Sequence, residues 1–321
     1  ILAFLRERTG VRDWVGSVGM GICATGREYF GEPALAVMIA ELAENSYRLL
    51  EGIDNPDALS KEVAGWADSR ESWFGIVHAD PRNGVIPDII AELADQLNGF
   101  LVGGLTSSHG ALSQVSGDVC DGGVSGVMLG ENVAVITALS QSCMPIGSRH
   151  QITACEENVL IELDGRPALD VFKEDIGELL ARDLQRVAGY IFAALPIANS
   201  DTGDYLVRNL AGIDVERQLL AIGEITETGQ SIQFCRRDAD AAETDLVRML
   251  ENLKKRTDTT PKGAVYFPCL ARGPNMFGDA SQELKIIERE LGDVPLVGFF
   301  CNGEISHRRL YTYTGVLTLF T

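Results

Sequence analysis

Basic residues are scarce in this sequence, and it has no long apolar run. Its 321 residues include 27 Lys and Arg against 46 Asp and Glu, which gives a formal net charge of −19. Surfaces that bind nucleic acid or anionic membranes need clustered Lys and Arg. A membrane-spanning helix needs about 18 or more consecutive apolar residues, and the most apolar stretch, 189–198, is far shorter. The composition therefore argues against nucleic-acid and membrane partners.

Metal-binding and disulfide patterns are also missing. Seven cysteines occur, an odd number, and no two of them form a Cys-x-x-Cys motif. Such scattered cysteines are typical of a reduced, cytoplasmic protein, and not of a disulfide framework or a zinc site. The four histidines also show no metal-ligand spacing; they are His78, His109, His150 and His307. We therefore expect a cytoplasmic protein without a structural metal.

The sequence contains no established catalytic motif. It has no P-loop, no Gly-x-Ser-x-Gly, no His-Glu-x-x-His and no complete dinucleotide fingerprint after a strand. Gly19-Met-Gly21 is a fragment of the last pattern and lacks the third glycine at the needed spacing. These absences favour a protein that is not an enzyme.

The residues that are present are typical of a globular protein with a sizeable core. Hydrophobic residues make up 45 % and charged residues 23 %. The length allows two domains at about 100–200 residues each. The segment Ile1–Arg8 resembles the end of a helix that stops near Gly10. We therefore expect that residues preceding Ile1 are missing.

A five-residue segment that contains Val-Gly, here called the Val-Gly phrase, occurs three times. It reads Leu-Val-Gly-Phe-Phe at 296–300, Leu-Val-Gly-Gly-Leu at 101–105 and Trp-Val-Gly-Ser-Val at 14–18. Each copy has an apolar, strand-like entry, and glycine lets the backbone approach a neighbour closely. Recurrence of this kind predicts a repeated structural unit.

The last two copies predict the same strand–helix–strand order. In the last unit, strands at 263–267 and 296–300 flank a helix at 281–291, and a strand at 310–320 follows. In the middle unit, strands at 73–77 and 100–105 flank a helix at 87–97. The first unit is expected to contain a helix at 1–8, a strand at 14–22 and a later strand at 34–40.

The remaining segments predict a hairpin and two long helices. Residues 124–129 and 133–139 are expected to pair around a turn at 130–132. A long helix is expected over 171–194, broken at Gly177, and an amphipathic helix over 239–255. We therefore expect an α/β to α+β fold in two intimately packed domains. Repeated strand–helix–strand units would form mixed sheets covered by helices.

Two polar clusters follow strands of the last unit. Cys269-Leu-Ala-Arg272-Gly273 comes directly after the strand at 263–267, at the kind of strand end where ligands bind. Arg272 could clamp a carboxylate or phosphate. It could equally pair with an acidic neighbour such as Glu304 and hold the turn.

The second cluster is Cys301-Asn302-Gly303-Glu304, which symmetry of the unit places beside the first. Glu304 could bind an amine or accept a proton, and Asn302-Gly303 could be only a turn. Cys269 and Cys301 are expected to lie close together. A buried thiol is more often a small apolar group than a nucleophile. Ser142–Gly147, which contains Cys143, is expected to be a loop after a strand.

These segments together resemble a FIST protein, with FIST-N and FIST-C regions in tandem. The residues that carry the resemblance are Gly103-Gly104, Ser142-Cys-Met-Pro-Ile-Gly147, Asn158–Ala168, Asp204-Tyr-Leu-Val-Arg208, Cys269–Gly273, Phe277-Gly278, Gly298–Ile305 and Tyr313–Phe320. They span nearly the whole chain in the expected order. The resemblance implies a FIST-N-like domain at 1–168, with its start missing, and a FIST-C-like domain at 169–321.

The resemblance implies an intracellular sensory domain that binds a small ligand such as an amino acid and acts in signal transduction. It implies a histidine kinase or a cyclic-dinucleotide enzyme as partner. A haem-binding nitric oxide sensor is an alternative, although no family haem histidine can be matched here. A cysteine-dependent enzyme and a protein-interaction scaffold are further alternatives.

We expect a ligand pocket in which Arg272 and Glu304 are complementary poles for a zwitterion. The expected ligand-binding residues are Gly103, Gly104, Cys143, Cys269, Arg272, Gly273, Cys301, Asn302, Gly303 and Glu304.

Overall fold

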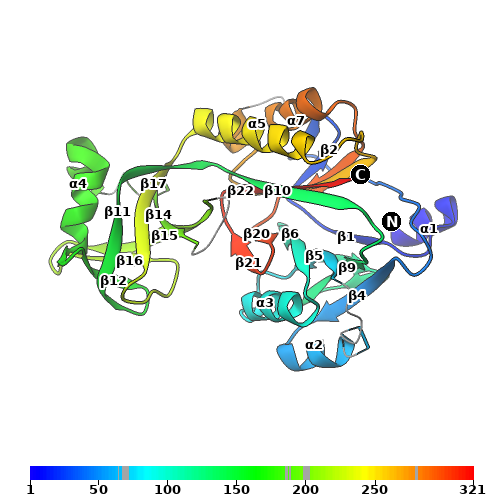
Figure 1. Cartoon of the computed structure of the whole chain (residues 1–321), viewed down its shortest axis with the longest axis horizontal. Coiled ribbons are helices and arrows are strands. Elements are labelled where there is room, and N and C mark those ends of the chain that lie inside the picture. Colours follow the sequence, from blue (N-terminus) through cyan, green and yellow to red (C-terminus); the bar gives the residue numbers. More distant parts are fainter. Residues whose placement is uncertain (64, 67–71, 185–186, 188, 198–202, 279–280) are drawn as a thin grey trace. The chain divides into compact units, whose positions relative to one another are not determined.

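The protein is described by a computed structural model that covers 1–321 except 64, 67–71, 185–186, 188, 198–202 and 279–280. The chain divides into two compact units, one built from 1–141 and 243–321 and the other from 142–242. Figure 1 follows the chain by colour through both. The larger unit therefore combines the two ends of the chain, and the smaller unit is inserted between them.

The larger unit contains two six-stranded mixed sheets. The first has the order β21-β20-β6-β5-β9-β4, with strands Arg309–Tyr311, Glu304–Ser306, Phe100–Leu105, Phe74–Ala79, Val124–Leu129 and Tyr47–Ile53. The second has the order β10-β22-β18-β19-β2-β3, with strands Val135–Gln141, Thr314–Phe320, Gly263–Pro268, Leu296–Phe299, Gly21–Ala24 and Arg27–Phe30. The expected mixed sheets are confirmed.

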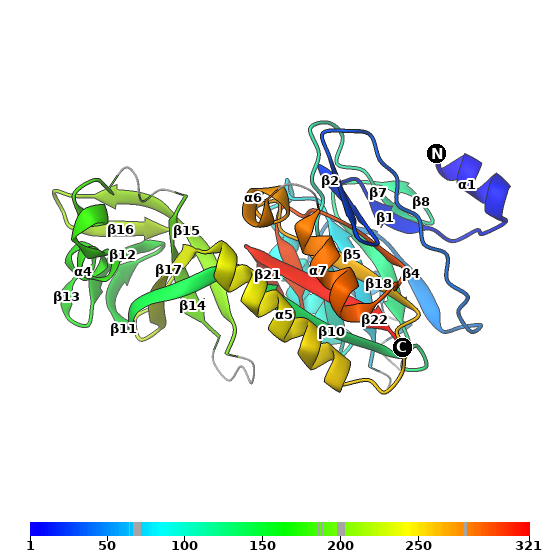
Figure 2. The same ribbon diagram turned by 90° about the horizontal axis from the view of Figure 1, so that it is seen from above.

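Helices cover the outer face of each sheet, as Figures 1 and 2 show. The first sheet carries α2 (Pro56–Glu62) and α3 (Ile86–Gln96), and the second carries α5 (Ala239–Lys255) and α7 (Gln282–Leu291). A separate apolar cluster joins the two inner faces; it includes Ile76, Val102, Val265, Phe267, Phe299 and Val316. Each central strand is buried on both faces, which explains its near-continuous apolar sequence.

The middle and last strand–helix–strand units are confirmed as two copies of one arrangement. In the first sheet, β5 and β6 are parallel and flank α3 in the chain. In the second sheet, β18 and β19 are parallel, and the short α6 (Pro274–Phe277) and α7 lie between them in the chain. Each unit is followed by an antiparallel strand that pairs with its first strand: β9 pairs with β5, and β22 pairs with β18.

The Val-Gly step has one physical cause in both copies. A Cβ built on Gly103 would lie 1.8 Å from the carbonyl oxygen of Val77, and one on Gly298 would lie 1.8 Å from that of Tyr266. Each glycine lets its strand approach the parallel neighbour where no side chain fits. Gly16, in the first occurrence of the phrase, has nothing within 4 Å of such a Cβ.

The prediction of a third copy at the start of the chain is wrong. The helix α1 (Leu2–Thr9) is present, but β1 (Val15–Ser17) pairs in a small sheet with β7 (Gln114–Ser116), which pairs with β8 (Asp118–Cys120). Residues 34–40 form no strand and expose apolar side chains such as Leu35 and Ile39. The strand was predicted from apolar content alone, but a strand forms only where a neighbouring strand is available to pair with it.

The predicted hairpin at 124–139 is also wrong. Both strands exist, as β9 and β10, but β9 pairs with β4 and β5 whereas β10 pairs with β22. The chain therefore crosses from the first sheet to the second at 130–134. Similarly, the strand expected at 310–320 is two strands, β21 and β22, because Tyr313 has a φ of 62° between them.

The smaller unit is a sheet that closes on itself. Its order is β11-β17-β14-β15-β16-β12-β13, with strands Cys143–Glu156, Ser231–Arg237, Ile191–Pro196, Tyr205–Asp214, Leu219–Ile222, Val159–Leu163 and Arg166–Pro167. The long β11 pairs with β17 in its first part and with β12 in its last part, which forms a barrel. The helix α4 (Ala168–Ala181) packs against this barrel.

Three expectations for this unit can be compared with its structure. The break at Gly177 is confirmed, since its φ of 79° is non-helical. Residues 191–194, expected to be helical, lie in β14, and part of the interval before them lies outside the described residues. The loop expected at 142–147 is instead the beginning of β11 at Cys143, because pairing with β17 decides its conformation.

Candidate functional site

Cys269 and Cys301 lie side by side where β18 and β19 end. They form an isolated parallel bridge, and the Cys301 N–H donates to the Pro268 carbonyl at 2.7 Å. The expected proximity of the two cysteines is therefore confirmed. A Cβ on Gly104, in β6, would lie 2.1 Å from the Cys301 sulfur, so this position also requires glycine. Parallel strands thus bring the two cysteine-containing segments together.

Glu304 is fully buried beside this pair. It lies opposite Gly104 in the β20–β6 ladder. The Thr314 N–H and hydroxyl donate to Glu304 Oε2 at 3.1 and 2.8 Å. Burial raises the pKa of Glu304 to about 8, although hydrogen bonds from Thr314 and Cys269 lower it. At neutral pH this carboxyl is therefore largely protonated, and Thr314 holds its Oε2.

Arg272 is also fully buried, and its guanidinium is engaged by Glu283. The distances to Glu283 Oε1 are 2.7 Å from Nε and 2.6 Å from Nη2. Glu283 also accepts hydrogen bonds from the Gly273 N–H at 2.9 Å and from the Tyr266 hydroxyl at 2.5 Å. Arg272 thus holds its turn through an acidic neighbour, one of the two roles that its sequence position allows, but the acid is Glu283 on α7 and not Glu304.

Burial keeps the two thiols of this cluster protonated. It raises the pKa of Cys269 far above its usual value, and the charge of Glu304 raises it further. The same two causes, in the same order, raise the pKa of Cys301. A cysteine nucleophile reacts as the thiolate. The environment of both residues therefore opposes cysteine catalysis and suits two small apolar groups.

A surface pocket of about 440 Å³ lies next to the Arg272–Gly273 turn. It is lined by Gly26, Arg27, Glu28, Phe30, Glu32, Pro274, Ser281 and Lys285. We call it the Glu28 pocket. Because a Cβ on Gly273 would lie 3.2 Å from Glu28 Oε2, the turn directly adjoins this carboxyl. Sequence reasoning found the turn but missed the pocket, since most of its wall comes from the distant β2–β3 hairpin.

Glu28 is the notable group of the Glu28 pocket. Its side chain is 9 % exposed, yet Oε2 has no hydrogen-bond partner among the described residues. Its backbone N–H donates to the Ser281 hydroxyl at 2.9 Å. Burial, and then the nearby charge of Glu283, raise the pKa of Glu28 to about 7. A buried carboxyl oxygen without a partner is costly and prepared to accept a hydrogen bond from a ligand.

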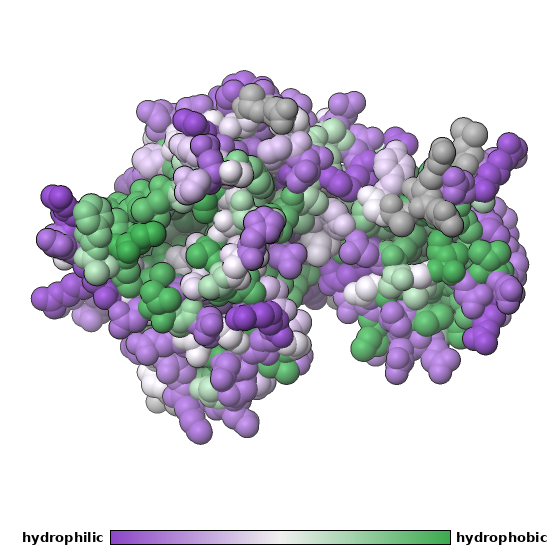
Figure 3. Space-filling view, turned by 180° about the vertical axis from the view of Figure 1, so that it is seen from behind, coloured by the Kyte–Doolittle hydropathy of each residue, from purple (hydrophilic) through white to green (hydrophobic). Residues whose placement is uncertain are grey.

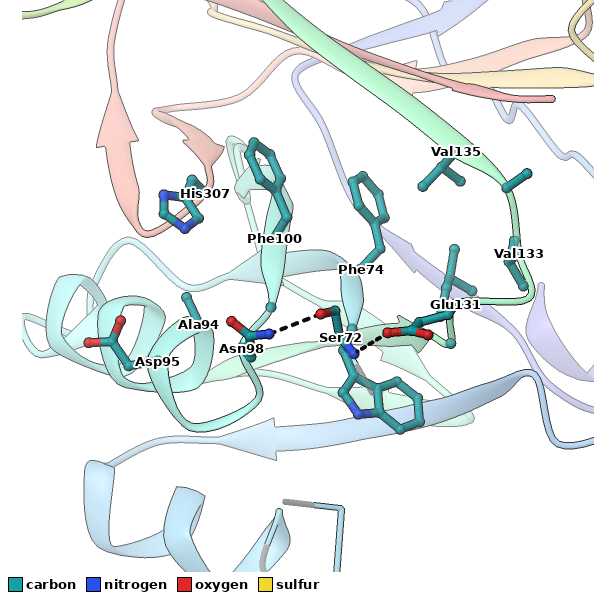
Figure 4. Close-up of a pocket in the computed structure, with 15 residues that line it drawn as sticks. Ser72, Phe74, Ala94, Asp95, Asn98, Phe100, Glu131, Val133, Val135 and His307 are labelled. Carbon is teal, nitrogen blue, oxygen red and sulfur yellow. Dashed lines mark hydrogen bonds between the residues drawn. The ribbon is translucent and has the colours of Figure 1, made fainter. Parts of the chain in front are cut away.

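A second and larger pocket, of about 620 Å³, lies at the amino ends of β5 and β6. We call it the aromatic pocket. Figure 4 shows the rings of His307, Phe100 and Phe74 in a row, with Asp95 near one end and Glu131 near the other. The ring centroids are 5.2 Å apart for Phe100 and His307 and 6.1 Å apart for Phe74 and Phe100. No residue of this pocket was expected from the sequence, because its wall combines β5, β6, α3, β10 and the β20–β21 turn.

Three other residues that were expected to bind the ligand lie in an exposed turn or in the barrel unit. Asn302 is exposed, and Gly303 has a φ of 136° in the turn before β20. Cys143 lies in the barrel unit, whereas the Cys269–Cys301 cluster belongs to the larger unit. Cys143 is buried beside Cys235, and the Tyr205 hydroxyl donates to its carbonyl oxygen.

The four histidines lie in different surroundings, which bear on whether an imidazole could reach a haem iron. Both nitrogens of His150 are engaged, by Asp164 at 2.6 Å and Asp175 at 2.9 Å. His78 is buried between the sheets, and burial lowers its pKa to about 4. His307 lines the aromatic pocket, where its ring stacks on Phe100. His109 is exposed in the loop after β6.

Two further observations concern metal clusters and membrane-spanning helices. Among the described residues, no group of three or more His, Cys, Asp or Glu side chains is arranged to hold a metal ion. No helix in the described part of the chain has the length and apolar composition to cross a membrane.

Comparison with known proteins gives matches over most of the chain. A family model described as the FIST N domain matches residues 1–166, and one described as the FIST C domain matches residues 168–307. The uncharacterized protein Rv0628c of Mycobacterium tuberculosis (strain ATCC 25618 / H37Rv) is 32 % identical over 95 % of this chain and 83 % of its own length. The uncharacterized protein Mb0898c of Mycobacterium bovis is 30 % identical over 95 % and 82 %. The border between the two family matches falls inside the barrel unit.

Proposed function

The chain belongs to the FIST family, whose domains are sensory domains linked to signal transduction, and we propose that it senses a free amino acid bound in the Glu28 pocket. The single observation that carries this proposal is the unpartnered Oε2 of Glu28, which is buried in the wall of that pocket. The ligand ammonium would donate to this oxygen. A charged donor makes such a hydrogen bond stronger than a neutral one.

The opposite charge is supplied by the same wall. Arg27 and Lys285 line the Glu28 pocket together with Glu28. An amino acid carries an ammonium and a carboxylate on one carbon, so a wall with acidic and basic side chains complements it. Arg27 is further held over the Tyr29 ring, with its guanidinium carbon 4.6 Å from the ring centroid. These charges support a zwitterion over a purely anionic or purely cationic ligand.

The buried cluster behind the pocket would transmit binding. The charges of Glu283 and Arg272 act on Glu28, the first raising its pKa and the second lowering it. A bound ammonium would ionise Glu28 and thereby change the field on the Arg272–Glu283 pair. That pair joins the end of β18 to α7, so the turn and helix are the elements that would respond.

In this proposal the residues expected from the sequence form the supporting layer of the site. Arg272 and Gly273 make the turn beside Glu28. Cys269, Cys301, Gly104 and Glu304 form the neighbouring buried cluster, which Gly103, Asn302 and Gly303 flank in the chain. Cys143 would have no part in ligand binding. The output would be a cytoplasmic partner such as a histidine kinase or a cyclic-dinucleotide enzyme.

Thermal unfolding with each of the twenty L-amino acids tests this function. A ligand that binds only the folded state raises the melting temperature, by about 2 °C or less for each kcal/mol in a protein of this size. We expect one amino acid or one chemical class of them to stabilise the wild type. Glu28→Gln should abolish that response, and the exposed control Glu216→Gln should retain it. Equal stabilisation of the wild type and Glu28→Gln would contradict the proposal.

A further inference from the structure

The aromatic pocket has the composition of a site for a positively charged organic molecule. Its floor is the row of Phe74, Phe100 and His307, and Phe100 leaves 38 % of its surface exposed. Aromatic ring faces attract cations, and exposed rings of this kind recognise ammonium groups. An exposed phenylalanine inside a hollow of about 620 Å³ is available to a ligand.

The acidic and basic side chains that line this pocket, among the residues that the structure describes, are all acidic. Asp95 and Glu131 line it, and its lining among the described residues contains no Lys or Arg. Glu131 Oε1 accepts a hydrogen bond from the Ser72 N–H at 2.8 Å, which fixes the carboxylate at the end of the row nearest Phe74. Asp95 pairs with Arg308 at 2.9 Å on the opposite side, so Glu131 is the stronger anchor for a cation.

His307 adds no positive charge to the pocket. Burial, and then the charges of Arg309 and Arg308, lower its pKa below the usual value. The imidazole is therefore mainly neutral at neutral pH, and its ring acts as a third aromatic surface. The Asn98 side-chain amide donates to the Ser72 hydroxyl at 2.9 Å, so these two polar side chains hold each other in place between Asp95 and Glu131.

The apolar side of the pocket suits a flat hydrocarbon group. Val135, the first residue of β10, and Val133, just before this strand, also line the pocket, and Figure 4 shows Val135 on the side of Phe74. In the space-filling view, apolar side chains also gather around a hollow on the larger unit (Figure 3). Aromatic faces, two valines and fixed carboxylates together complement an amine with an aromatic or aliphatic body.

We propose that the aromatic pocket is a second ligand site, which binds a small organic amine or quaternary ammonium through stacking on Phe100 and a charge-assisted contact with Glu131. The site differs from the Glu28 pocket in all of its residues. It also differs in ligand class, since an amino acid carboxylate would meet two carboxylates and no basic side chain of the lining. The two sites can therefore be tested separately.

Calorimetry with three probes of one shape tests the proposal. The probes are 2-phenylethylamine, which is a cation, 2-phenylethanol, which is neutral, and 3-phenylpropionate, which is an anion. We expect the wild-type protein to bind the amine about tenfold or more tightly than the other two, because only the amine gains the contact with the carboxylate. Similar affinity for all three, or preference for the anion, would overturn the proposal.

Matched variants assign the binding to this pocket. Glu131→Gln keeps the acceptor for Ser72 N–H and removes the charge, so it should weaken amine binding about tenfold. Phe100→Leu keeps an apolar side chain and removes the ring face, and should weaken it as well. Glu28→Gln should leave amine binding unchanged. Amine binding that survives both Glu131→Gln and Phe100→Leu, or that is lost in Glu28→Gln, would overturn the assignment.

Discussion

Gly103 and Gly298 occupy the same place in two copies of one strand–helix–strand unit. Each follows a valine on the second of two parallel strands. A Cβ added at either glycine would lie 1.8 Å from a carbonyl oxygen of the first strand. The Gly103 Cα pairs with Val77, and the Gly298 Cα pairs with Tyr266. The Val-Gly phrase therefore marks strand contacts that position the site residues at 269–273 and 301–304.

We predict that Gly298→Ala destabilises the protein by about 1–3 kcal/mol or more, because the added methyl must displace backbone. Gly16→Ala is the matched control, since a Cβ at that position would meet nothing within 4 Å. Its effect should stay within about 0.5 kcal/mol. Urea unfolding of both variants measures the difference. Equal destabilisation would contradict this explanation of the repeated phrase.

We predict that Glu283→Gln destabilises the protein by about 3–5 kcal/mol, because it leaves the buried Arg272 guanidinium without a charged partner. The double variant Arg272→Met, Glu283→Gln should recover part of that loss, since it removes both charges. Denaturant unfolding of the two variants gives the comparison. A double variant no more stable than Glu283→Gln would show that Arg272 does not depend on Glu283.

We predict that stability falls as the pH rises from about 5 to about 8. The folded-state pKa is raised to about 7 for Glu28 and to about 8 for Glu304. The folded state therefore holds protons that the unfolded state has released, and stability is present at low pH and lost as pH rises through these values. The slope is at most about 1.4 kcal/mol per pH unit for each carboxyl.

The pH dependence has a clear control. The double variant Glu28→Gln, Glu304→Gln keeps hydrogen-bonding side chains and cannot release these protons. Urea midpoints measured between pH 5 and 8 should fall less steeply in this variant than in the wild type. An equal slope in both proteins would mean that other groups cause the dependence.

We predict slow alkylation of Cys269 and Cys301 in the folded protein at pH 7, because both are buried and have raised pKa values. The partly exposed Cys120 and Cys155 should react first. Mass spectrometry after timed iodoacetamide treatment identifies the sites, and protein in urea serves as the fully reactive control. Rapid labelling of either buried cysteine would support cysteine catalysis.

The parts of the fold that could be predicted are those encoded by local patterns. The periodic apolar positions of 281–291 and 87–97 predicted α7 and α3 because one helical face must be buried. The pairing of β9 and β10 with different sheets was not visible, because both strands and the intervening turn also suit a hairpin. Strand pairing depends on segments that are distant in the sequence. Residues 34–40, for example, have the composition of a strand but form none, because they pair with no other strand.

The site was predictable to a similar degree. The turn with Arg272 and Gly273 and the neighbouring Cys301–Glu304 were found, since they follow strands that carry the repeated phrase. Glu28 and Glu283 were missed, although Glu283 stands in the first turn of a predicted helix. The two carboxyls matter because they are buried close to each other. This happens only when the β2–β3 hairpin packs against α7, and these two elements are about 250 residues apart in the sequence.

The most direct test of amino acid sensing at Glu28 is the proton balance of binding. At pH 7 a carboxyl with a pKa of about 7 is roughly half protonated, and a bound ammonium lowers its pKa. Calorimetry of the most stabilising amino acid, in buffers of different ionisation enthalpy, should show release of roughly half a proton per ligand. Glu28→Gln should lose this release and bind weakly. Tight binding without proton release, unchanged in Glu28→Gln, would contradict the account.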